Sequence, residues 1–181
     1  SSNSWGSNAS GAYSIDSQTY DALVRDAQPT GAAFSQIGNQ EMVIVFASGN
    51  QGPSSGSVNS PGSAKNVITV GAAENVQPLG GVDACNVDDG SANSANDMAS
   101  FSGRGPTADG RRKPDIVAPG THITGGVPQA STTPPQNGQA NPCYTGSGVC
   151  GGVNSIYFPN GQQFYTASRS EERRVGKECL R

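Results

Sequence analysis

The sequence predicts an α/β domain built on a mainly parallel sheet. A helix is indicated over residues 16–28 by apolar residues at helical spacing. Those residues are Tyr20, Leu23, Val24 and Ala27. A continuous apolar run over residues 42–48 is typical of a strand buried on both faces of a parallel sheet. A strand, a helix and a second strand joined by short connections form a βαβ unit, which predicts parallel strands in one sheet.

The flanking residues set the expected ends of these elements. Residues 2–6 are expected to be the end of the first strand, where it runs into a loop rich in Gly and Asn. Asp16 or Ser17 is the expected helix cap, and Pro29 follows the last helical residue.

Two further strands are expected to extend the sheet. Residues 67–72 form another short apolar run, and residues 115–118 form a third that Pro119-Gly120 stops. The stretches 75–96 and 125–154 are expected to be long loops or hairpins, longer than a compact domain usually holds without a functional reason.

Composition narrows the class of protein. The 181 residues are enough for one domain, and the 25 Gly and 12 Pro follow no Gly-X-Y period. The longest apolar run, residues 42–47, is too short to cross a membrane, and no signal peptide is visible. With a net charge of −3, the sequence lacks the excess of basic residues that is typical of nucleic-acid-binding proteins. We therefore expect neither a membrane nor a nucleic acid as a partner.

The charge changes abruptly near the end of the sequence. Residues 169–181 hold 5 of the 11 Lys and Arg residues, whereas residues 1–168 are net acidic. One interpretation is a solvated C-terminal helix with charges of both signs. The other is a non-native tail, because residues 169–179 resemble the translation of a common sequencing-library adapter. We adopt the second interpretation, with residues 1–168 as part of one domain.

The cysteines indicate an oxidising compartment. The sequence has four of them: Cys85, Cys143, Cys150 and Cys179. Cys143 and Cys150 are close together in a Gly-rich loop, which predicts a local disulfide, with Cys85 free or paired outside this sequence. No CxxC pair or His cluster has metal-ligand spacing, so a zinc site is not expected.

Asn50 is the first candidate for chemistry. In parallel α/β sheets, ligands bind beyond the carboxyl ends of the strands, and Asn50 comes two residues after the strand predicted over residues 42–48. A side-chain amide at that place can donate a hydrogen bond into a cleft. The alternative is a turn-forming Asn in a Gly-rich segment.

Five segments resemble those of the subtilisin-like serine peptidases. Residues 47–52 (ASGNQG) resemble the stretch that carries the oxyanion-hole Asn of that family. The other segments are residues 3–6, residues 59–62 with 65–71, residues 99–106 and residues 113–121. Each segment is only moderately specific, but their order along the chain identifies it as a member of this family.

The resemblance implies a secreted, monomeric endopeptidase with helices on both faces of its sheet. Such an enzyme cleaves polypeptides with a Ser/His/Asp triad. Asn50 would donate to the tetrahedral oxyanion together with a backbone N–H. The primary specificity pocket would be lined by two groups of residues: Ser4, Trp5 and Gly6 on one side, and Ala47, Ser48 and Gly49 on the other. Calcium is a candidate cofactor because many members of the family bind it, but no residue here is assigned to it.

The triad residues are not expected in this chain. In the family the Asp and His motifs precede the substrate-binding strand, and the nucleophile would follow residues 164–168. The sequence continues there as Arg169-Ser170, without the Gly-Thr-Ser-Met-Ala motif. His122, the only His, is expected to be structural. We therefore expect a partial catalytic domain, truncated at both ends and inactive as it stands.

Other interpretations were weighed against this one. A non-enzymatic extracellular module could bind a ligand through its Asn/Gly-rich loops. The Gly-x-Gly-x-x-Gly pattern at Gly146, Gly148 and Gly151 lacks the strand and helix of a dinucleotide site. The acidic stretch 83–97 lacks the spacing of a helix–loop–helix calcium site and is expected to be a solvated loop.

Overall fold

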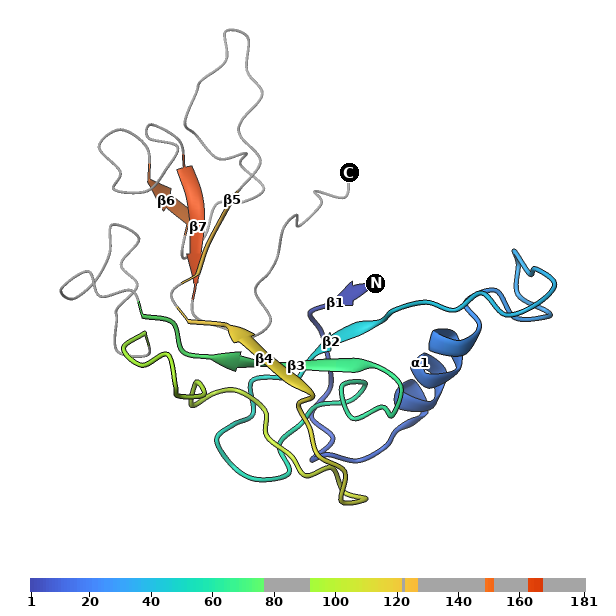
Figure 1. Cartoon of the computed structure of the whole chain (residues 1–181), viewed down its shortest axis with the longest axis horizontal. Helices are drawn as coiled ribbons and strands as arrows, with labels where there is room; N and C mark the ends of the chain where they lie inside the picture. The colour runs from blue at the N-terminus through green and yellow to red at the C-terminus, as the bar shows by residue number, and fades with distance from the viewer. Residues whose placement is uncertain (77–91, 122, 127–148, 152–162, 168–181) are drawn as a thin grey trace, which may run out of the picture. The chain divides into compact units, whose positions relative to one another are not determined.

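The fold is taken from a computed structural model, which describes residues 1–76, 92–121, 123–126, 149–151 and 163–167. The chain divides into two compact units (Figure 1). The first unit contains Ser1–Ala73 and Met98–Ala118, and the second contains Glu74–Asp97 and the described residues from Pro119 onward. The predicted catalytic and substrate-binding residues all lie in the first unit.

A four-stranded sheet organises the first unit. Its strands are β1 (Ser2–Asn3), β2 (Val45–Ala47), β3 (Ile68–Ala73) and β4 (Ile116–Pro119), in the order β1-β2-β3-β4. β1 pairs with β2 in parallel, and β2 pairs with β3 in parallel. The predicted parallel sheet is therefore confirmed, although β2 begins three residues later than the apolar run suggested.

Helix α1 (Ile15–Arg25) is shorter than predicted and has a different cap. The cap is Ser14, whose Oγ accepts a hydrogen bond from the backbone N–H of Ser17, so the prediction of Asp16 or Ser17 is wrong. The helix ends before Asp26, whose carboxylate accepts from the backbone N–H of Gln28. This local bond competes with a further helical turn and ends the helix three residues before position 28.

The core of the first unit lies between α1 and the sheet. Its buried cluster is Ile44, Phe46, Ala64 and Val67. Tyr20, Leu23 and Val24 of α1 pack against this cluster, which confirms the predicted apolar face of the helix. Ala27, the fourth predicted member, lies beyond the end of α1. Among the described residues α1 is the only helix, and it covers one face of the sheet. Helices on the other face therefore stay a prediction.

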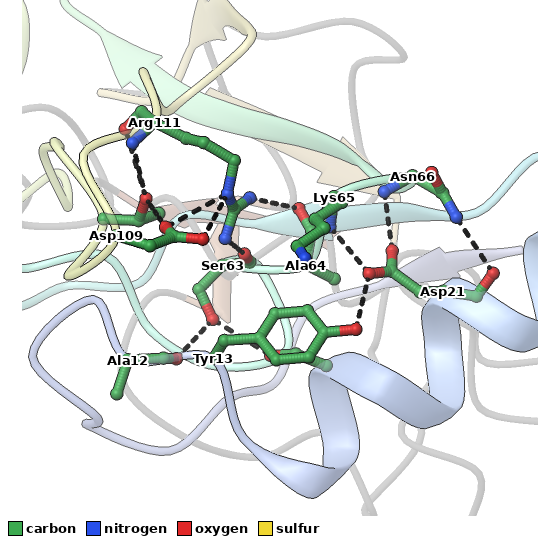
Figure 2. A network of polar contacts seen from close by, with 11 residues as sticks. Ala12, Tyr13, Asp21, Ser63, Ala64, Lys65, Asn66, Asp109 and Arg111 are labelled. Carbon is green, nitrogen blue, oxygen red and sulfur yellow. Dashed lines mark hydrogen bonds and ion pairs between the residues drawn. The ribbon is translucent and has the colours of Figure 1, made fainter.

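A polar network fixes α1 to the segment that precedes β3 (Figure 2). The buried Asp21 carboxylate accepts from the Tyr13 hydroxyl at 2.9 Å and from the backbone N–H groups of Lys65 and Asn66 at 3.0 and 2.6 Å. Arg111 donates to the carbonyls of Ser63 and Ala64 from the other side of this segment. The network therefore holds α1 against the segment that precedes β3.

The second unit contains a three-stranded antiparallel sheet. Its strands are β5 (Ile123–Gly126), β6 (Val149–Gly151) and β7 (Gln163–Ala167), in the order β5-β7-β6. β6 lies inside the stretch 125–154 that was expected to form loops or hairpins. β7 was not predicted from the sequence.

Candidate functional site

The two segments predicted to line the pocket leave the sheet at the same edge. β1 and β2 are parallel neighbours, with Ser2 opposite Val45 and Asn3 opposite Phe46. The chain therefore continues from both strands in the same direction, into Ser4–Gly6 on one side and into Ser48–Asn50 on the other. The amide of Asn3 also donates to the carbonyl of Val45 at 3.1 Å, which ties the two segments together at their start.

Trp5 is held in place by aromatic packing. Its ring meets that of Phe46 edge-on at a centroid distance of 5.5 Å, and that of Tyr20 at 5.8 Å. Phe46 is fully buried, whereas Trp5 keeps 45% of its surface exposed. The indole thus anchors the segment Ser4–Gly6 to the core while presenting an apolar face to solvent.

The turn after β2 is fixed by the segment 101–103. Gly49 has a φ of +92°, a left-handed conformation that favours glycine. Its carbonyl accepts from the N–H of Gly103 at 2.8 Å, and the N–H of Gly52 donates to the carbonyl of Phe101 at 2.8 Å. Asn50 lies between these two attachments and is half-buried. Its backbone is therefore held on both sides, as the rigid presentation of a polar group requires.

Ser48, which is predicted to belong to the second wall, has a buried side chain. It is fully buried, and its Oγ contacts Ser102 Oγ at 3.3 Å. Its backbone N–H donates to Val70, and its carbonyl accepts from Asn59. Gly49 is buried as well, whereas Ala47 and Asn50 are half-buried.

Asn59 was not recognised as a site residue from the sequence. It is 4% exposed and lies against both predicted walls. A Cβ atom placed on Gly49 would lie 2.5 Å from Asn59 Cγ, and one on Gly6 would lie 3.1 Å from Asn59 Cβ. Asn59 opens the segment 59–62 that carries part of the family resemblance, and only its position beside a Pro-Gly turn was informative.

The predicted site residues carry no ionisable side chain. Tyr13 and Asp109, whose pKa values are shifted, lie elsewhere in the first unit. Desolvation, together with the hydrogen bond to Asp21, raises the pKa of Tyr13 above its ordinary value. The hydrogen bond from Arg111 lowers the pKa of Asp109 to about 2. The predicted site residues therefore offer neutral hydrogen-bonding groups and no charge.

Within the described ranges, no group of three or more His, Cys, Asp and Glu side chains could hold a metal ion. No helix in the same ranges has the length and apolarity needed to cross a membrane. Several predicted features lie outside the described residues: the acidic residues 83–89, His122, Cys143, Gly146, Gly148 and the tail.

Comparison with known proteins identifies the family. The profile of the subtilase family, Peptidase_S8, matches residues 1–148, which is most of the chain. The fold and the order of the motifs thus define a subtilisin-like serine peptidase domain. The chain belongs to the subtilase family, and the predicted resemblance is confirmed.

Several curated relatives are similar to parts of the chain. Serine protease AprX of Bacillus subtilis is 39% identical over 109 residues, which is 60% of this chain and 21% of the relative. Pyrolysin of Pyrococcus furiosus is 43% identical over 95 residues, which is 48% of this chain and 7% of the relative. The chain thus spans about a fifth or less of the length of these two relatives.

Two solved structures also match. Sphericase covers 71% of this chain at 24% identity, with a TM-score of 0.34, and the match spans 29% of that structure. The S41 psychrophilic protease covers 46% of this chain at 29% identity, with a TM-score of 0.31, and the match spans 25% of that structure.

Proposed function

We propose that the protein containing this chain is a secreted serine endopeptidase, and that the edge of the sheet beyond β1 and β2 binds the polypeptide around the scissile bond. One observation carries the proposal. The parallel pairing of β1 with β2 brings Ser4–Gly6 and Ala47–Asn50 to the same edge of the sheet. In α/β folds this carboxyl edge is where ligands bind.

Asn50 serves in this proposal as an oxyanion-hole donor. Attack by a serine hydroxyl on the scissile carbonyl places negative charge on the carbonyl oxygen. The amide N–H of Asn50 donates to that oxygen, together with a backbone N–H. The attachments at Gly49 and Gly52 fix the Asn50 backbone before the substrate arrives, so little reorganisation is needed.

The two walls position the substrate. Trp5 holds Ser4–Gly6 on the core through Phe46 and Tyr20. Gly6 and Gly49 let both walls pack closely on Asn59, because a Cβ on either residue would meet its side chain. The triad residues are assigned to no position in this chain, so the proposed activity belongs to the full-length gene product.

Three further expectations belong to the same proposal. The intact enzyme is a monomer, and Cys143 pairs with Cys150 as expected of a secreted protein. Calcium is a candidate cofactor of the intact enzyme, as in many members of the family, and no residue of this chain is assigned to it.

The full-length gene product tests the proposal directly. It is incubated with labelled casein and with a fluorophosphonate probe that reacts with activated serines. We expect turnover that the probe abolishes, and labelling of one serine. A purified full-length protein that binds peptides but neither cleaves casein nor reacts with the probe would support the binding-module alternative instead.

A further inference from the structure

Residues 29–39, in the connection between α1 and β2, are exposed without interruption, which is the longest such run in the described part of the chain. We call them the exposed loop, and Figure 1 shows it projecting from the end of α1. Phe34 keeps 80% of its surface exposed, and Ile37 is fully exposed. A Cβ atom on Gly31 or on Gly38 would meet nothing within 4 Å. The tip of the loop therefore packs against very little of the protein.

The hydrogen bonds of the exposed loop are local. The N–H of Ala32 donates to the carbonyl of Pro29 at 3.0 Å, and the N–H of Ser35 donates to the carbonyl of Ala32 at 3.2 Å. The N–H of Gln36 donates to the carbonyl of Gln28 at 3.1 Å. These bonds join residues that are eight positions apart or fewer, so the loop can open without disturbing the sheet. Local opening of this kind costs much less free energy than global unfolding.

The base of the loop, in contrast, is attached to α1. The N–H of Ala27 donates to the carbonyl of Gln40 at 2.9 Å, and the N–H of Met42 donates to the carbonyl of Val24 at 3.1 Å. The Asp26 carboxylate accepts from the N–H of Gln40 at 3.4 Å. An opening of the exposed loop therefore ends at these bonds, and α1 and β2 stay in place.

We propose that the exposed loop is a self-cleavage site, and that its cleavage gives a two-chain enzyme whose chains stay bound to each other. The inference rests on the proposed function, because the active enzyme is the catalyst. One copy hydrolyses a peptide bond within residues 29–39 of another copy. The amide C–N bond breaks, one water molecule is consumed, and a new carboxylate and a new amine replace the amide.

The loop has the properties of a good peptidase substrate. Exposed loop tips are preferred sites of proteolytic cleavage, because they can enter a peptidase cleft after a small local opening. Phe34 and Ile37 offer apolar side chains to such a cleft. Residues 27–40 contain no Asp, Glu, Lys or Arg, so no charge has to be desolvated when the loop binds.

The contacts that hold the two parts together do not involve the exposed loop. The part before the cut contains β1 and α1, and the part after it contains β2 and β3. β1 pairs with β2, and α1 packs its apolar face against the buried cluster. The Asp21 carboxylate of α1 also accepts from the segment that precedes β3. Cleavage therefore leaves the fold and the candidate site intact.

The accessibility of the loop can be tested without the enzyme's own activity. The full-length enzyme is inactivated with the fluorophosphonate probe, treated briefly with chymotrypsin, and then digested with trypsin for mass spectrometry. Trypsin releases residues 26–65 as one peptide, because residues 26–64 contain no Lys or Arg. Chymotrypsin cuts after aromatic residues, so we expect the bond after Phe34 to break before those after Tyr13 and Phe46, which are 38% and 0% exposed.

Self-cleavage is tested with the active full-length enzyme incubated alone. We expect new chain ends within residues 29–39, and none in the probe-inactivated enzyme. The two chains should elute together in size-exclusion chromatography and keep full casein activity per probe-labelled site. A variant that lacks residues 30–37 should lose these ends and keep its casein activity. Asp16→Ala, which changes an exposed residue of α1, is the control and should be cleaved like the wild type.

Three results would overturn the inference. They are chymotryptic cuts at Tyr13 or Phe46 before Phe34, an intact peptide 26–65 in an enzyme that cleaves casein, and separation of the two chains after the cut. In each of them the proposed function would stand. A full-length protein that cleaves neither casein nor itself and does not react with the probe would contradict the proposed function itself.

Discussion

Gly49 and Gly31 have the same φ of +92° but different surroundings. A Cβ on Gly49 would meet Asn59 atoms at 2.5 Å, whereas one on Gly31 would meet nothing within 4 Å. The pair therefore separates backbone strain from steric overlap. At Gly31 only the left-handed backbone requires glycine, whereas at Gly49 the packing of the site requires it too.

This contrast gives a prediction for alanine substitutions. Gly31→Ala should lower the free energy of unfolding by about 1–2 kcal/mol, from backbone strain alone. Gly49→Ala should cost about 1–3 kcal/mol more, because the added methyl group must displace the Asn59 amide. Urea denaturation of the two purified variants measures the difference. Equal costs for both would show that Asn59 does not fill the space beside Gly49.

The residues of the site differ in how far the sequence could predict them. Asn50 and Gly49 were identified because they follow an apolar run within a recognisable motif, and the structure places them just beyond β2. The buried side chain of Ser48 and the contact of Asn59 with both walls depend on segments that meet only in three dimensions. No local sequence pattern could indicate that the Ser48 hydroxyl would form a hydrogen bond with the Ser102 hydroxyl.

Among the secondary-structure elements, the presence of the helix was predictable from the sequence, but the residues at which it begins and ends were not. The apolar spacing of Tyr20, Leu23 and Val24 indicated α1 correctly, because that face packs on the core. The end of α1 is set by a hydrogen bond of the Asp26 side chain. The sequence pattern did not indicate this end, because an Asp can lie either inside a helix or just after it. β7 was missed because its pairing with β5 and β6 joins residues far apart in the sequence.

The attachment of α1 should depend strongly on Asp21. Asp21→Ala should lower the free energy of unfolding by about 2–3 kcal/mol, because two backbone N–H groups and the Tyr13 hydroxyl lose a charged acceptor. Asp16→Ala on the same helix is the control. It removes an exposed charge in the first turn and should cost about 0.3–1 kcal/mol. Similar costs at the two positions in urea denaturation would argue against the network of Figure 2.

At the scale of the whole molecule, the family was predictable because its motifs lie along one continuous stretch. The family profile matches residues 1–148, and the predicted motifs lie within residues 3–121. The motifs could not predict the antiparallel sheet of the second unit, because none of its strands contains a motif. The interpretation of residues 169–181 as a non-native tail stays a prediction.

In the proposed enzyme, Asn50 stabilises the transition state of peptide hydrolysis. The most direct test compares kcat and KM of the full-length enzyme with those of Asn50→Leu, normalised to probe-labelled active sites. We predict that kcat falls by about 10²–10³ with little change in KM, which is the loss seen when an oxyanion-hole donor is removed in a subtilisin. Asn39→Leu should leave both constants unchanged. If Asn50→Leu instead lowered only the unfolding midpoint and kept full turnover per active site, Asn50 would be a turn residue and the account would be contradicted.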